Sequence, residues 1–175
     1  QVTERKKAEG EVQVRVDQQA VVAQLGQRAL GGCSLDELFR EATEQVARTL
    51  GVEYCKVLEL LSVGNELLLR AGVGWKEGLV GRATVGTGLD SQAGYTLLSD
   101  KPVVVEDLRT ETRFNGPPLL HEHNIVSGMS VIISSKEKPF GVLGAHTTKR
   151  RTFTKDDVKF LQAVANVLTT TIEHR

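Results

Sequence analysis

The spacing of hydrophobic and polar positions predicts helices in the first third of the chain. Behind Ser34, apolar residues recur at three- and four-residue steps as far as Leu50, which predicts an amphipathic helix ending at Gly51. Ser34 and Glu37 have the spacing of a capping box at its start. Residues 12–30 are polar, rich in Gln and free of Pro, with two narrow apolar stripes; these are Val12, Val16, Ala23 and Leu30, and Val14, Val21 and Leu25. We expect this helix to pack against other helices.

The pattern then changes to strands. Residues 54–61 and 66–73 are strand-like and flank Gly64 and Asn65, a two-residue hairpin signal. Residues 74–94 are rich in Gly and predict a loop. The remaining expected elements are a short strand at 103–105, a turn-rich loop at 107–118, a short helix at 119–124, and a second hairpin formed by 125–134 and 140–148.

The C-terminal segment predicts the clearest helix. Thr154 and Asp157 form a capping pair, and Val158, Leu161, Ala165, Leu168 and Ile172 follow with the spacing of a heptad seam. A second apolar side consists of Phe160, Val164 and Val167. One side can cover the sheet while the other meets a partner, and the pattern does not decide which. Strands between flanking helices predict an α+β fold with an antiparallel sheet.

Composition narrows the possible functions. The 175 residues suffice for one domain with a helical extension. Lys and Arg total 22 and Asp and Glu total 22, so charge gives no reason to expect nucleic-acid binding or membrane contact. Cys33 and Cys55 lack metal-site spacing and are expected to be structural thiols in a reducing cytoplasm. Because the chain starts at Gln1 and its one Met is Met129, we expect a fragment of a larger protein.

Four stretches, taken together, resemble a GAF domain over about residues 34–173; they are residues 67–72, 101–108, 140–145 and 153–157. The resemblance implies a six-stranded antiparallel sheet, helices on one face, and a ligand pocket between the other face and the loops. Residues 2–9 resemble the exit from a PAS domain in bacterial and archaeal sensors. We therefore expect residues 1–33 to form a linker or signalling helix after an upstream PAS domain, and 34–175 to form the GAF domain with its C-terminal helix.

No catalytic or metal motif is evident, so we expect no enzyme activity and no metal. G-x-S-x-G and G-K-[ST] are both absent, and His121 and His123 would point apart on a helix and are expected at the surface. Residues 106–125 contain no Cys for bilin attachment, and both cysteines lie outside the loops used by family members that reduce methionine sulfoxide. The family's cyclic-nucleotide motif is only half matched, by Lys149, Phe153 and Asp157 but not by Thr148 and Val158. We expect no cofactor and a colourless protein.

A small-molecule pocket remains possible. Trp75 and Tyr95 are scarce large aromatic residues near Gly-rich segments, and Asp107, Arg113 and Phe114 follow the short strand. His146 lies in a strand beside the pocket that the resemblance implies, where it is a candidate contact for a ligand or for haem. In the alternative interpretation these six residues pack or cap loops, and side chains fill the pocket.

The predicted function is that of a cytoplasmic regulatory sensory domain in a signal-transduction protein. We expect a homodimer held by the terminal helices, coupling an unidentified small molecule or an upstream signal to a histidine kinase of a two-component system. A diguanylate cyclase or phosphodiesterase is the second choice of output domain. The competing hypothesis is a structural dimerisation module without a ligand.

Overall fold

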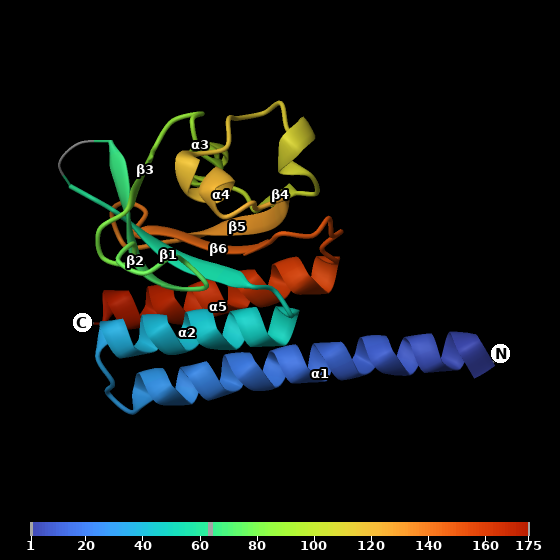
Figure 1. The fold of residues 1–175 in the computed structure, drawn as a ribbon. Coiled ribbons are helices and arrows are strands. Elements are labelled where there is room, and N and C mark those ends of the chain that lie inside the picture. Colours follow the sequence, from blue (N-terminus) through green and yellow to red (C-terminus); the bar gives the residue numbers. More distant parts are fainter. Residues whose placement is uncertain (1, 63–64, 175) are drawn as a thin grey trace.

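A single twisted sheet organises the domain in the computed structural model, which describes residues 2–62 and 65–174. Six antiparallel strands lie in the order β3-β2-β1-β6-β5-β4 (Figure 1). Their bounds are β1 Tyr54–Leu60, β2 Glu66–Val73, β3 Thr84–Gly86, β4 Val103–Val105, β5 Ser127–Ile133 and β6 Gly141–Thr147. The α+β fold with a six-stranded antiparallel sheet is therefore confirmed.

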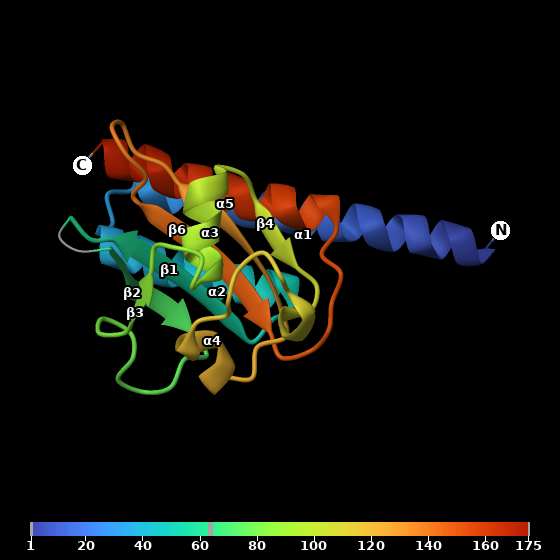
Figure 2. The same cartoon turned by 90° about the horizontal axis from the view of Figure 1, so that it is seen from above.

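Three long helices form a layer on one face of this sheet. They are α1 (Val2–Leu30), α2 (Leu35–Leu50) and α5 (Lys155–Glu173). Helices α2 and α5 pack directly on the strands, and α1 packs outside them against both helices (Figures 1 and 2). We call the opposite side of the sheet the distal face. It is covered by α3 (Gln92–Ser99), the short helix α4 (Pro118–Glu122), a 3₁₀ turn (Leu108–Thr110) and connecting loops.

Local sequence signals fix the helix ends. The Ser34 hydroxyl accepts a hydrogen bond from the Glu37 amide at 3.2 Å, and Gly51 adopts a left-handed conformation with φ 68° after α2. Only this half of the predicted capping box is formed, because the Glu37 side chain makes no return bond to the Ser34 amide in the described structure. At the start of α5, Thr154 and Asp157 form the complete reciprocal capping box. These caps satisfy backbone groups that the first and last helical turns leave unpaired.

The two apolar stripes of α1 differ in how far they are buried. In one stripe Leu25 is buried and Val21 is partly buried against the helical core, while Val14 near the N-terminus is exposed. Val12, Val16 and Leu30 of the other stripe are 54%, 50% and 84% exposed. The N-terminal part of α1 extends past the rest of the domain (Figures 1 and 2). The outer stripe therefore has no partner among the described residues.

The heptad seam of α5 faces the domain itself. Leu161, Ala165 and Leu168 are fully buried in the core between the helices and the sheet. On the second side, Phe160 and Val164 are also buried there. The buried members of either stripe are therefore not free to form a coiled-coil seam, whereas Val167 of the second side is only partly buried and lines a groove between α1 and α5. Val164 and Leu168 both lie in this core, so replacing either by glutamate would report on folding rather than on dimerisation.

The predicted loop at 74–94 contains two elements that the sequence pattern did not reveal. Strand β3 pairs with β2, and α3 begins at residue 92, where the Ser91 hydroxyl caps it by accepting from the Gly94 amide at 2.8 Å. Both elements gain their stability from packing on the sheet rather than from a local period. Strands β1 and β2 pair as predicted, although Gly64 of the predicted turn lies outside the described residues.

Candidate functional site

Two basic side chains converge on the distal face at the centre of the sheet. Lys56 on β1 lies opposite Gly144 on β6, and His146 follows two residues later, so both side chains point to the same face. A β-carbon placed on Gly144 would lie 2.9 Å from His146 Nε2 and 3.2 Å from Lys56 Cε. The glycine leaves the space above it to these two side chains.

His146 is buried and makes no hydrogen bond to the described part of the chain. Its exposed fraction is 0%, and neither ring nitrogen has a partner among the described residues. The ring lies close over Gly128, where an added β-carbon would be 2.2 Å from Nδ1. Burial, together with the positive charge of Lys56, holds the pKa of His146 well below its ordinary value. Buried polar groups are normally hydrogen-bonded, so the fold alone does not account for this side chain.

Lys56 is also buried, with no counter-ion among the described residues. It is 2% exposed, and its Nζ lies 5.5 Å from the centroid of the Trp75 ring, which provides a cation–π contact. Within the described part of the chain, Lys56 has no ion pair and its ammonium makes no hydrogen bond. Burial lowers the pKa of this lysine to about 7.

Aromatic rings surround the two basic groups. The centroid of Trp75 lies 4.9 Å from Tyr54, 5.0 Å from His123 and 6.2 Å from His146. The indole Nε1 donates to the Cys55 carbonyl at 2.9 Å and so fixes the ring beside the sheet. We call these five side chains, Tyr54, Lys56, Trp75, His123 and His146, the distal cluster.

His123 corrects the expectation of a surface residue. It is 4% exposed, whereas the neighbouring His121 is exposed. His123 Nε2 accepts from the Lys76 amide at 3.0 Å, which leaves the proton on Nδ1, 2.8 Å from the Leu119 carbonyl. The ring therefore joins α4 to the segment that carries Trp75. No group of three His, Cys, Asp or Glu residues suited to a metal ion occurs within residues 2–62 and 65–174.

A polar contact attaches α3 beside the distal cluster. Ser130 on β5 lies opposite Gly144, on the side away from Lys56. Its hydroxyl accepts from Gln92 Nε2 at 3.1 Å and lies 2.8 Å from Thr96 Oγ1. These three side chains are buried and satisfy one another, so Ser130 is a structural residue rather than a free nucleophile.

The six predicted site residues fall into separate groups. Trp75 and His146 belong to the distal cluster, while Tyr95 and Phe114 pair with centroids 5.5 Å apart. The Arg113 guanidinium lies over both of those rings and donates to the Val104 carbonyl at 2.7 Å and to Glu111.

Asp107 caps the 3₁₀ turn and binds Arg109. Arg113 and Asp107 thus have local partners that hold the loop after β4.

The sequence analysis did not identify two residues of the distal cluster, Lys56 and His123. The available signal for Lys56 was a lysine at an inward position of a strand with apolar neighbours.

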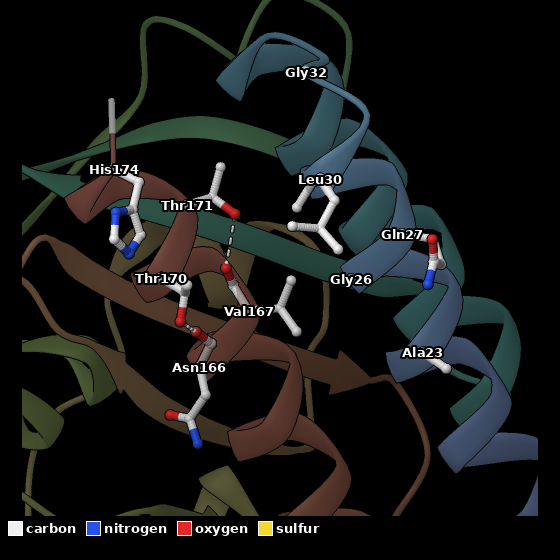
Figure 3. A pocket seen from close by; sticks show the side chains of 11 residues that line it. Ala23, Gly26, Gln27, Leu30, Gly32, Asn166, Val167, Thr170, Thr171 and His174 are labelled. Atoms are coloured by element: carbon white, nitrogen blue, oxygen red, sulfur yellow. Dashed lines mark hydrogen bonds between the residues drawn. The ribbon is translucent and has the colours of Figure 1, made fainter.

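A second feature is a groove between the ends of α1 and α5. It encloses about 840 Å³, and the side chains at its walls are mostly small or apolar (Figure 3). They include Ala23, Gly26 and Leu30 from α1, and Val167 and Thr170 from α5. The groove lies on the helical side of the domain, away from the distal cluster.

The antiparallel sheet, its helical layer and its covered distal face define an α+β domain of the sensory and regulatory class. The family model for the GAF domain matches residues 34–172, and the chain belongs to this family. No curated protein sequence matches it significantly.

Solved structures with low sequence identity share the fold. The GAF domain of a phosphoenolpyruvate-protein phosphotransferase from Coxiella burnetii is 18% identical, with a TM-score of 0.82 over 91% of this chain and 95% of that one. A methyl-accepting chemotaxis protein fragment is 18% identical, with a TM-score of 0.71 over 85% and 94%. Free methionine-R-sulfoxide reductase from Neisseria meningitidis is 16% identical, with a TM-score of 0.76 over 88% and 87%. One fold thus serves regulatory proteins and an enzyme, so function depends on the site.

Proposed function

We propose that this GAF domain is a sensory unit that passes a signal from the distal face, or from an upstream domain, to an output domain through its terminal helices. The observation that carries the proposal is the packing of α1 on α5 and of α5 on β5. Strand β5 also carries Ser130 on its distal face. A structural change on the distal face at Ser130 is therefore separated from α5 by this one strand. Gln18 of α1 donates to Asp157 of α5 at 2.9 Å in a buried hydrogen bond that joins the two helices.

The output that we favour is a histidine kinase of a two-component system in the cytoplasm. The likeness of residues 2–9 to a PAS exit supports a PAS domain upstream, and helix-to-helix coupling suits a kinase output. A diguanylate cyclase or phosphodiesterase is the alternative. An assay for kinase, cyclase and phosphodiesterase activity in the full-length protein would decide between them. None of the described helices is long and apolar enough to cross a membrane.

The domain is proposed to regulate rather than to catalyse, without a bound cofactor. The engaged Ser130 and the absence of a recognised catalytic motif support this view. We expect purified protein to be colourless and to show no turnover. Saturable hydrolysis or redox activity would contradict the absence of turnover. A stoichiometric haem spectrum lost in His146→Ala would contradict the absence of a cofactor.

A second copy of the chain is the proposed partner of α1 and α5. The groove between the two helices ends at Leu30, which is 84% exposed, and the outer valines of α1 are also exposed. A helix of 29 residues with an unsupported N-terminal part gains stability from packing along its length. We expect sedimentation equilibrium to show a dimer at micromolar concentration.

Matched leucine substitutions test that interface. Leu30→Glu should weaken the dimer, because a glutamate would have to be desolvated in the contact. Leu98→Glu is the control, since Leu98 is 66% exposed on α3 at the distal side. A monomeric unsubstituted protein, or equal association of both variants, would place the contact elsewhere or remove it.

Ligand dependence separates a sensor from a purely structural dimerisation module. A molecule that binds only the folded state must raise the melting temperature. A metabolite library screened by thermal melting should therefore contain compounds that stabilise the domain. A stable dimer that no compound shifts would favour the structural module.

A further inference from the structure

The distal cluster contains two basic groups that have neither a counter-ion nor a hydrogen bond among the described residues. Lys56 and His146 are 2% and 0% exposed and approach each other over Gly144. Native proteins pair buried charges and hydrogen-bond buried polar atoms, because leaving either alone is unfavourable. Within the described chain no carboxylate meets Lys56, and no donor or acceptor meets His146.

We propose that Lys56 and His146 bind the carboxylate group of a small organic acid, an inference that rests on the proposed sensory role of the distal face. One carboxylate oxygen would accept from the Lys56 ammonium and the other from the N–H of His146. Both side chains border Gly144, where an added β-carbon would lie 2.9 Å from His146 Nε2 and 3.2 Å from Lys56 Cε. A carboxylate therefore satisfies, with one charge and two oxygens, what the fold leaves unsatisfied.

Charge favours a monocarboxylate over a phosphate. Lys56 is the one cationic side chain in the distal cluster, and its positive charge together with burial opposes protonation of His146. The site can therefore supply at most one positive charge, whereas a phosphate dianion would remain undercompensated in a buried setting. Leu58 and Val142 on the same face are fully buried, so the body of the ligand would meet apolar surface.

The aromatic side chains decide what size of ligand fits. Trp75 covers the cluster and is held by its bond to the Cys55 carbonyl and by contact with His123. A ligand must displace this ring or its neighbours to reach the buried ammonium, which favours a short acid. Trp75 is also the single tryptophan of the chain, so its fluorescence reports binding at this site.

Propionate is the probe, with propionamide as its uncharged isostere and inorganic phosphate as the competing anion. We expect propionate at millimolar concentration to change Trp75 fluorescence saturably and to raise the melting temperature, and the other two to do neither. Lys56→Met should weaken propionate binding by roughly tenfold or more, the loss expected for a charge-assisted hydrogen bond. His146→Leu should weaken it as well, whereas Lys159→Met, at an exposed position on α5, should bind normally.

Any of the following results would refute the proposed carboxylate site. Equal binding of propionamide would remove the role of charge, and unchanged binding in folded Lys56→Met would remove this lysine. Binding of phosphate alone would exclude a carboxylate. No response to propionate would also refute the inference, yet the sensory function would survive if library compounds still shifted the melting temperature without depending on Lys56. If neither propionate nor any library compound binds, the ligand-gated function fails too.

Discussion

Replacing Lys56 by methionine should stabilise this domain. The substitution keeps an unbranched side chain of similar length beside Trp75 but removes an ammonium group that is 2% exposed and has no counter-ion among the described residues. A structural lysine would normally stabilise a fold through an ion pair or hydrogen bond. Here the unligated domain instead has to neutralise or tolerate a buried charge, as functional sites often do.

The magnitude follows from the pKa of Lys56. Burial lowers it from 10.5 to about 7. Near pH 8 the lysine is protonated in the unfolded chain and mostly neutral in the folded one, so folding includes a deprotonation that costs about 3 kcal/mol. Methionine does not incur this cost. For a domain of this size, the gain corresponds to a rise in Tm of roughly 6–12 °C.

The pH dependence gives the effect a specific sign. Between about pH 7 and 10.5 the unfolded chain binds more protons than the folded one at this residue, so the stability of the unsubstituted protein rises with pH. The advantage of Lys56→Met should therefore shrink to about 1 kcal/mol near pH 10.

Urea unfolding at both pH values, followed by Trp75 fluorescence and circular dichroism, measures this difference. Lys159→Met, at an exposed position, should change stability by less than about 0.5 kcal/mol. If Lys56→Met destabilises the domain, or stabilises it equally at both pH values, Lys56 is not an unpaired buried base.

Three further substitutions test other parts of the structure. Gln18→Ala removes the buried hydrogen bond to Asp157 and should lower the free energy of unfolding by about 1–3 kcal/mol. Hydrogen exchange should show that amide protection is lost in α1 rather than in the sheet. A uniform loss of protection would contradict a local role for this bond. Gly144→Ala places a methyl group 2.9 Å from His146 Nε2 and should cost about 1–3 kcal/mol in urea unfolding, whereas Gly10→Ala, with open space around it, should not destabilise. Burial lowers the pKa of His146, so below about pH 6.5 the unfolded chain binds more protons than the folded one and stability falls on acidification. The His146→Leu variant should therefore lose less stability than the unsubstituted protein between about pH 7 and 5. An identical loss in both proteins would refute this assignment.

Much of the fold was predictable because its signals are local. The cap at Ser34, the capping box at Thr154 and the left-handed Gly51 each depend on side chains and backbone within a few residues. The two hairpins likewise follow from alternating patterns. The element α3 was missed because its stability comes from Ser130 and the sheet, which lie far away in the sequence.

The candidate site was predictable only in part. The sequence pointed to His146 and Trp75 from residue type and position, and these two side chains do lie together. It also pointed to Asp107 and Arg113, which the structure shows engaged in local loop contacts. Residue type identifies candidates, but it does not reveal whether a polar side chain finds a nearby partner.

The sequence by itself determined the helices, the main strands and the family, because periodicity, caps and short motifs act over a few residues. Only the tertiary structure decided which apolar stripes remain free. From its spacing alone, the heptad seam of α5 is equally compatible with a dimer interface, but in the structure it is buried against the sheet. The outer stripe of α1, in contrast, is exposed. In the same way, strand pairing alone sets Lys56 opposite a glycine and beside His146. Burial and cross-strand neighbours depend on residues distant in the chain, and the linear pattern does not encode them locally.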